Sequence, residues 1–132
     1  MKMHINPKKI IELGIVKPVE QTLVQQVGID LTTSRDIELN HTEFENFVIN
    51  EEIEIPDNLF ALVWSRSTFN RRGIIIRGVV LDPGYHGRPS FSVYNLSGEK
   101  VLIPKNERVL QILFFECNPA KPYAGQYQGE GI

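Results

Sequence analysis

The stretch Gly78-Val79-Val80-Leu81-Asp82-Pro83-Gly84-Tyr85-His86-Gly87 does most to decide how this chain folds. Apolar residues lead into a turn of Asp82, Pro83 and Gly84, the residue types that tight turns favour, so the stretch predicts a β-hairpin. It can also carry chemistry, because Asp82 can hold or deprotonate a hydroxyl or a water and Tyr85 can offer a flat ring to a sugar. An ordinary hairpin, with Asp and Gly present only for turn geometry, is the competing interpretation.

The rest of the chain predicts an all-β fold with one short helix. Asn6 can cap a helix that Pro7 opens and Gly14 ends. After it, short apolar runs punctuated by Gly, Pro, Asn or Asp predict strands over Val27–Leu31, Phe47–Ile55, Leu59–Trp64, Ile74–Ile76, Val79–Leu81, Phe91–Tyr94, Val101–Ile103 and Val109–Phe115. Many short strands at this spacing favour a sandwich, a jelly roll or a closed barrel.

Length and composition predict one soluble domain. The 132 residues fit a single core, with an N-terminal helical segment over residues 1–19 and a flexible C-terminal arm over residues 119–132. A net charge of −2 gives no broad attraction to nucleic acid or to an anionic membrane. No apolar run approaches the roughly 20 residues that span a bilayer, and no signal peptide is evident. We therefore expect a cytoplasmic protein with no nucleic-acid or membrane partner, and a buried Cys117.

Three further segments carry candidate site residues. In Gly28-Ile29-Asp30-Leu31, the acid faces away from the core if its apolar neighbours face it, so Asp30 is either a solvated strand acid or a carboxylate beside a divalent ion. The segment Arg66–Gly73 offers forked arginine donors and hydroxyls that suit phosphate oxygens, or is a solvated basic loop. Gln111 is either an interior amide satisfied by backbone or a donor to a phosphate.

In sequence order, these segments resemble the motifs of the dUTPase and dCTP deaminase superfamily. Gly28–Leu31 resembles its first motif, Arg66-Ser67-Thr68 its second, Gly78–Gly87 its third and Arg108–Leu113 its fourth. The resemblance implies a small distorted β-barrel or jelly roll of the dUTPase type (a β-clip). It also implies a homotrimer with active sites at the subunit interfaces.

The resemblance further implies hydrolysis of dUTP to dUMP and pyrophosphate with Mg²⁺ as cofactor. Asp82 would be the catalytic residue, orienting or deprotonating the attacking water, and Asp30 would act on the metal through bound water. Tyr85 would pack under the deoxyribose, and backbone groups of the hairpin from Asp82 to Phe91 would recognise uracil. The remaining substrate-binding residues would be Arg66, Ser67, Thr68, Arg71, Gln111, Tyr127 and Gln128, the last two capping the base.

Within the superfamily the chain resembles two branches. The N-terminal helix, the Arg66–Arg71 string and the tail Gln126-Tyr127-Gln128-Gly129 resemble dCTP deaminases. The deaminase glutamate and histidine, however, fall on Ser92 and Val79, and serine cannot shuttle the proton near neutral pH. The alternatives to dUTP hydrolysis are therefore dCTP deamination, alone or coupled to hydrolysis, a catalytically silent nucleotide-binding or regulatory trimer, and a structural jelly-roll protein without a ligand.

Overall fold

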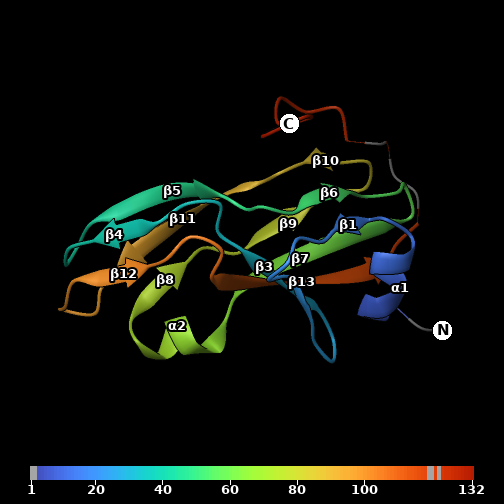
Figure 1. Cartoon of the computed structure of the whole chain (residues 1–132). Helices are drawn as coiled ribbons and strands as arrows, with labels where there is room; N and C mark the ends of the chain where they lie inside the picture. Colours follow the sequence, from blue (N-terminus) through green and yellow to red (C-terminus); the bar gives the residue numbers. More distant parts are fainter. Residues whose placement is uncertain (1–2, 119–120, 122) are drawn as a thin grey trace.

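The computed structural model describes residues 3–118, 121 and 123–132. These residues form two short helices and thirteen strands, shown in Figure 1. In chain order they are α1 (Pro7–Glu12), β1 (Val16–Lys17), β2 (Leu23–Val24), β3 (Ile29–Thr32), β4 (Ile37–Leu39), β5 (Phe44–Val48), β6 (Glu52–Glu54), β7 (Leu59–Ser65), α2 (Ser67–Arg71), β8 (Ile74–Ile76), β9 (Val79–Leu81), β10 (His86–Gly87), β11 (Ser90–Asn95), β12 (Val101–Ile103) and β13 (Arg108–Glu116).

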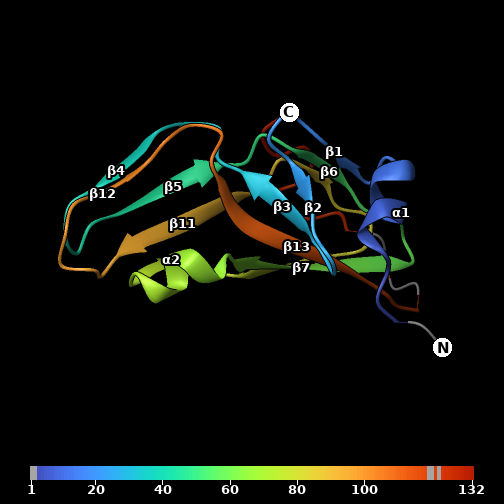
Figure 2. The same cartoon turned by 60° about the horizontal axis from the view of Figure 1, so that its bottom comes forward.

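The strands pair antiparallel in four sheets. The largest has the order β2-β3-β13-β7-β9, and two three-stranded sheets have the orders β1-β6-β10 and β5-β11-β8. β12 pairs with β4 at one end of the molecule, and α1 lies at the opposite end (Figures 1 and 2). The predicted all-β, jelly-roll-like class with a short N-terminal helix is confirmed.

The core explains why these strands form. Burial alternates along strands such as β7, β8, β11 and β12, so one face of each is buried while the other carries exposed or half-exposed side chains. On β3, β7 and β13 the inward residues Ile29, Leu31, Val63 and Ile112 are all fully buried. They lock the register of the large sheet, because a slip of one residue would turn these side chains to the outer face.

Several predicted elements are confirmed and some boundaries are wrong. The Asn6 side chain accepts from the Lys8 N–H at 2.9 Å, so the N-cap of α1 is as expected. The run predicted over Phe47–Ile55 is instead two strands, β5 and β6, in different sheets. Between them lies the buried Glu51, whose carboxylate accepts from the Thr32 N–H and hydroxyl at 3.0 and 2.9 Å.

Of the strands that the sequence did not predict, β1, β2 and β10 are two residues long and β4 is three, too short to show a period. Cys117 is half-buried, not a core residue as expected, since it follows the end of β13. Of the helices in the described ranges, neither has the length and apolar character that a bilayer crossing requires.

Candidate active site

The Asp30 carboxylate lies on the outer face of the large sheet. Asp30 on β3 pairs with Gln111 on β13, which pairs with Trp64 on β7, and residues paired across strands share a face. Asp30 is nevertheless only 1% exposed, so the interpretation as a solvated strand acid is wrong. The side chains of Arg66 and Arg108 cover it, which the alternation of residues along a strand cannot reveal.

The contacts of Asp30 leave one oxygen free. Oδ2 accepts from Gln25 Nε2 at 2.8 Å and from Arg108 Nη1 at 3.2 Å, and lies 3.6 Å from Arg66 Nε. Oδ1 is buried and has no hydrogen-bond partner among the described residues. A buried polar atom without a partner is costly, so this oxygen is suited to a ligand that supplies one.

The segment after β7 forms the short helix α2, a second helix beyond the one that the sequence predicted. Arg66 is the N-cap of α2, and its guanidinium donates to the Arg108 carbonyl at 3.2 Å. Ser67, Thr68 and Arg71 are exposed on this helix. The helix thus places hydroxyls and an arginine in solvent next to the Asp30 cluster, without using them in the core.

Gln111 is half-buried beside Asp30. Its side-chain amide forms no hydrogen bond to any part of the chain that the structure describes. The interpretation as an interior amide satisfied by backbone is therefore not supported by the contacts. Gly28 allows this packing, because a Cβ there would lie 2.8 Å from Gln111 Cγ and 2.6 Å from the Ile112 oxygen.

A cavity of about 410 Å³ lies beside the predicted catalytic acid. It is lined by Val79, Val80, Leu81, Asp82, Tyr85, Pro89, Ser90, Tyr123, Tyr127 and Glu130. Asp82 follows the end of β9 and is exposed. Tyr85 is buried, and burial, followed by the negative charge of Glu130, raises the pKa of its hydroxyl. The cavity therefore has an accessible carboxylate at its rim and aromatic rings in its walls.

The C-terminal tail forms one wall of this cavity. The Tyr85 hydroxyl donates to Glu130 Oε1 at 3.0 Å, and the Ser90 hydroxyl donates to Glu130 Oε2 at 3.1 Å. Figure 1 shows the tail, in red, running along β10. Part of the predicted arm, at residues 119–120 and 122, lies outside the described residues.

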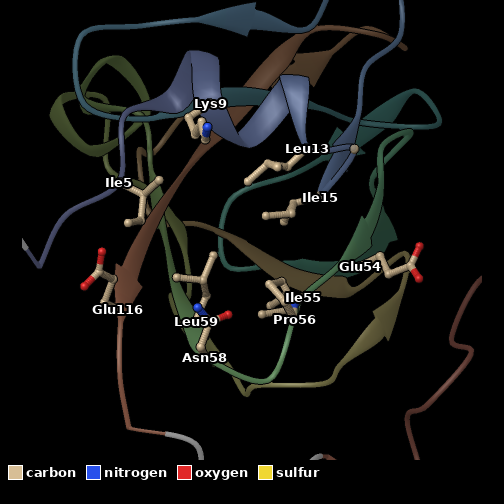
Figure 3. Close-up of a pocket in the computed structure, with 11 residues that line it drawn as sticks. Ile5, Lys9, Leu13, Ile15, Glu54, Ile55, Pro56, Asn58, Leu59 and Glu116 are labelled. Atoms are coloured by element: carbon tan, nitrogen blue, oxygen red, sulfur yellow. The ribbon is translucent and has the colours of Figure 1, made fainter.

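A larger cavity of about 580 Å³ lies between α1, the end of β6 and the start of β7. Ile5, Ile15 and Leu59 point into it, while Lys9 and two glutamates stand at its rim (Figure 3). None of the residues predicted for the site lines it. The volume of a cavity therefore does not identify the candidate active site in this protein. The arrangement of polar side chains around a cavity does so better.

Within one chain, the predicted residues form two groups. Asp30, Arg66 and Gln111 lie together, whereas Asp82, Tyr85 and Tyr127 surround the smaller cavity. β3 and β9 are separated in the sheet by β13 and β7, three inter-strand steps of about 4.8 Å, or about 14 Å in all. A single chain does not bring the two groups into one site.

Sequence reasoning missed several residues that the structure places at these groups. Gln25 and Arg108 hold Asp30, and Ser90 lines the cavity. Gln25 lies in a loop with no distinctive pattern, so no sequence signal could have found it. Ser92 does not line the cavity, and its hydroxyl donates to Asn46 Oδ1 at 2.7 Å.

Comparison with known proteins agrees on one family. A family model described as dUTPase matches residues 17–127. The chain is 30% identical over 132 residues to a dCTP deaminase from Pyrococcus horikoshii, covering 87% of this chain and 85% of that protein. It is 39% identical over 87 residues to a probable deoxyuridine 5′-triphosphate nucleotidohydrolase from Methanosarcina mazei, covering 63% of this chain and 50% of that protein.

Solved structures share the fold. The native dUTPase of EIAV is 19% identical, with a TM-score of 0.64 over 96% of this chain and 98% of that one. The dUTPase of Staphylococcus bacteriophage 80alpha with dUPNHPP is 18% identical, with a TM-score of 0.65 over 89% of this chain and 94% of that one. At this identity the likeness is one of fold.

Proposed function

Because the chain belongs to the dUTPase family, and is thus related to enzymes that act on nucleoside triphosphates, we propose that it converts dUTP and water to dUMP and pyrophosphate, with Mg²⁺ as cofactor. The observation that carries the proposal is the exposed Asp82 carboxylate at the rim of the 410 Å³ cavity. This volume lies within the range of about 300–1,000 Å³ for small-ligand sites.

In this proposal the cavity holds the deoxynucleoside. Asp82 accepts from the sugar hydroxyl and orients or deprotonates the attacking water. A carboxylate is a weak base, so most of the acceleration comes from positioning and charge stabilisation. Tyr85 and Tyr127 supply aromatic walls, and a ribose 2′-hydroxyl packed against Tyr85 would lose its hydration.

The Asp30 group suits the triphosphate. Arg66 and Gln111 donate to phosphate oxygens, and Ser67, Thr68 and Arg71 extend this polar surface. Mg²⁺ is commonly held by one or two carboxylates together with substrate phosphates, and the free Asp30 Oδ1 fits that arrangement. The bound ion would neutralise charge that develops on the phosphates.

A homotrimer would unite the two groups, with Asp82 from one subunit and Asp30 from its neighbour. The outer face of the large sheet supports association, because Leu23, Trp64 and Val80 are 43%, 56% and 59% exposed there. Exposed apolar patches of this kind mark interaction surfaces. The stacked Phe60 and Phe115 rings, with centroids 5.4 Å apart, extend the same face.

A second candidate function is dCTP deamination, favoured by the 30% identity to dCTP deaminases over most of the chain. The Ser92 side chain argues against it, since its hydroxyl is engaged with Asn46 and serine is a poor proton shuttle. A silent nucleotide-binding trimer is favoured by the Glu130 carboxylate, which adds negative charge to the cavity beside Asp82.

One assay separates these functions. Purified protein with Mg²⁺ is given dUTP, dCTP, dTTP or UTP, and pyrophosphate, orthophosphate and ammonia are measured. Pyrophosphate from dUTP alone supports hydrolysis, ammonia from dCTP supports deamination, and binding without any product supports the silent trimer. In the first case, Asp82→Asn should abolish turnover and keep dUTP binding, because the amide preserves the shape but not the base.

A further inference from the structure

The Asp30 carboxylate has one uncharged side-chain partner, Gln25. Gln25 Nε2 donates to Oδ2 at 2.8 Å, the shortest of the three contacts that this oxygen makes with side-chain nitrogens. Arg108 Nη1 lies at 3.2 Å and Arg66 Nε at 3.6 Å. All three donors meet on Oδ2, so together they fix the plane of the carboxylate and leave Oδ1 without a hydrogen bond to the described residues.

Backbone pairing places Gln25 beside Asp30. β2 pairs antiparallel with β3, and Leu23 lies opposite Asp30 (Figure 2). The Gln25 N–H donates to the Gly28 oxygen at 2.8 Å and closes the tight turn between the two strands. The backbone of Gln25 is therefore fixed by a turn that ends two residues before Asp30.

A buried carboxylate anchors the other end of this segment. Thr22, the residue before β2, donates its hydroxyl to Glu51 Oε2 at 2.5 Å. The same carboxylate accepts from the N–H and the hydroxyl of Thr32, which lies two residues after Asp30 on β3. Glu51 and Thr32 are fully buried. The segment that carries Gln25 is thus tied to β3 on both sides of Asp30, which restricts the movement of the Gln25 carboxamide away from it.

An uncharged donor suits a metal-binding carboxylate. The amide of Gln25 holds Oδ2 without adding positive charge that would repel Mg²⁺, whereas each guanidinium adds one charge. The proposed function also assigns Arg66 to phosphate oxygens, so a bound triphosphate draws this arginine from Asp30. Resting on that function, we propose that Gln25 is a positioning residue of the metal site, which holds Asp30 Oδ2 and so keeps Oδ1 free for the bound ion.

The test compares wild type with Gln25→Ala and Gln26→Ala. Gln26 is a matched control, because it is the next glutamine in the same turn, is exposed, and forms no side-chain hydrogen bond to the described residues. Calorimetry gives the affinity of each protein for the dUTP analogue dUPNHPP, once with Mg²⁺ and once with EDTA. The ratio of the two affinities is the gain that the metal supplies.

The metal-dependent gain should fall about tenfold in Gln25→Ala and stay unchanged in Gln26→Ala, because partners of metal-binding side chains are typically worth 10- to 100-fold in metal affinity. The affinity in EDTA should not change, since Gln25 acts through the metal-binding carboxylate. Gln25→Leu, which keeps most of the side-chain volume, should behave like Gln25→Ala. When Asp30 is already replaced in Asp30→Asn, adding Gln25→Ala should have no further effect on the gain.

A second measurement follows hydrolysis of dUTP. Gln25→Ala should raise the Mg²⁺ concentration for half-maximal rate about tenfold and leave the rate at saturating Mg²⁺ within a few-fold of wild type. Loss of folded protein would instead lower the rate in the same proportion at every Mg²⁺ concentration.

Four outcomes would each overturn the inference: no gain from Mg²⁺ in wild type, an unchanged gain in Gln25→Ala, an equal loss in Gln26→Ala, or a further loss on adding Gln25→Ala to Asp30→Asn. The proposed function fails separately, when no pyrophosphate is released from dUTP. A tenfold lower gain in Gln25→Ala without hydrolysis by wild type would leave the inference standing.

Discussion

Mixing two inactive variants tests whether the active site is shared between subunits. The strand that carries Asp30, β3, and the strand that leads into Asp82, β9, lie about 14 Å apart in the sheet of one chain, too far for both acids to act on one water and its phosphate. Asp82→Asn should abolish dUTP hydrolysis, and Asp30→Asn should lower it on the order of 100-fold, the usual cost of losing one well-aimed group. Both should fold, since Asp82 is exposed and asparagine keeps the Asp30 contacts that Oδ2 makes.

Equal amounts of the two variants are unfolded together, refolded and assayed for pyrophosphate release. In the mixture, residue 82 of a shared site is wild type in about half of the sites, and residue 30, which comes from another subunit, is independently wild type in about half. The mixture should therefore recover about a quarter of the wild-type rate. Each variant refolded alone is the control. A mixture no more active than its parents would refute the shared site and, with it, the proposed trimer.

Two further predictions concern association and pH. Val80→Lys, at a 59% exposed position, should leave the free energy of unfolding within about 0.5 kcal/mol of wild type. The same change should shift the protein to monomers in sedimentation analysis, and a variant that stays trimeric would contradict this prediction. Hydrogen bonds from Lys17 and then His86 lower the pKa of Glu52 to about 2. This depressed pKa contributes stability above pH 4.5, which is lost as the pH falls towards 2. The melting temperature of Glu52→Gln should therefore be below that of wild type at pH 6 and equal to it near pH 2, and a difference independent of pH would show that the carboxylate charge is unimportant.

The turn after β9 and the helix α1 illustrate what local sequence can predict, whereas the β-hairpin predicted around that turn is wrong, because β9 pairs with β7 and β10 pairs with β6. Asp82, Pro83 and Gly84 specify a turn through their own backbone preferences, and the N-cap of α1 depends on Asn6 and a neighbour two residues away. The apolar runs at β7, β8, β9, β12 and β13 were predicted to within a residue or two, because they are short apolar stretches with turn-forming residues beside most of them. These features are short-range.

The burial of Asp30 illustrates what local sequence cannot predict. Its alternation with Ile29 and Leu31 correctly assigns it to the outer face, but Gln25, Arg66 and Arg108 cover it there from three other segments. The hydrogen bonds of Glu130 to Tyr85 and Ser90 join residues 40 or more positions apart, so a sequence periodicity cannot predict them either.

By itself, the sequence determined the β class, the short helix and the family, because these depend on residue order and on periods within a few residues. Only the tertiary structure decided that the candidate residues form two separate groups and that Arg66 and Arg108 cover Asp30. The physical reason is that both outcomes depend on which strands pair and on which polar atoms find partners, and those contacts are long-range.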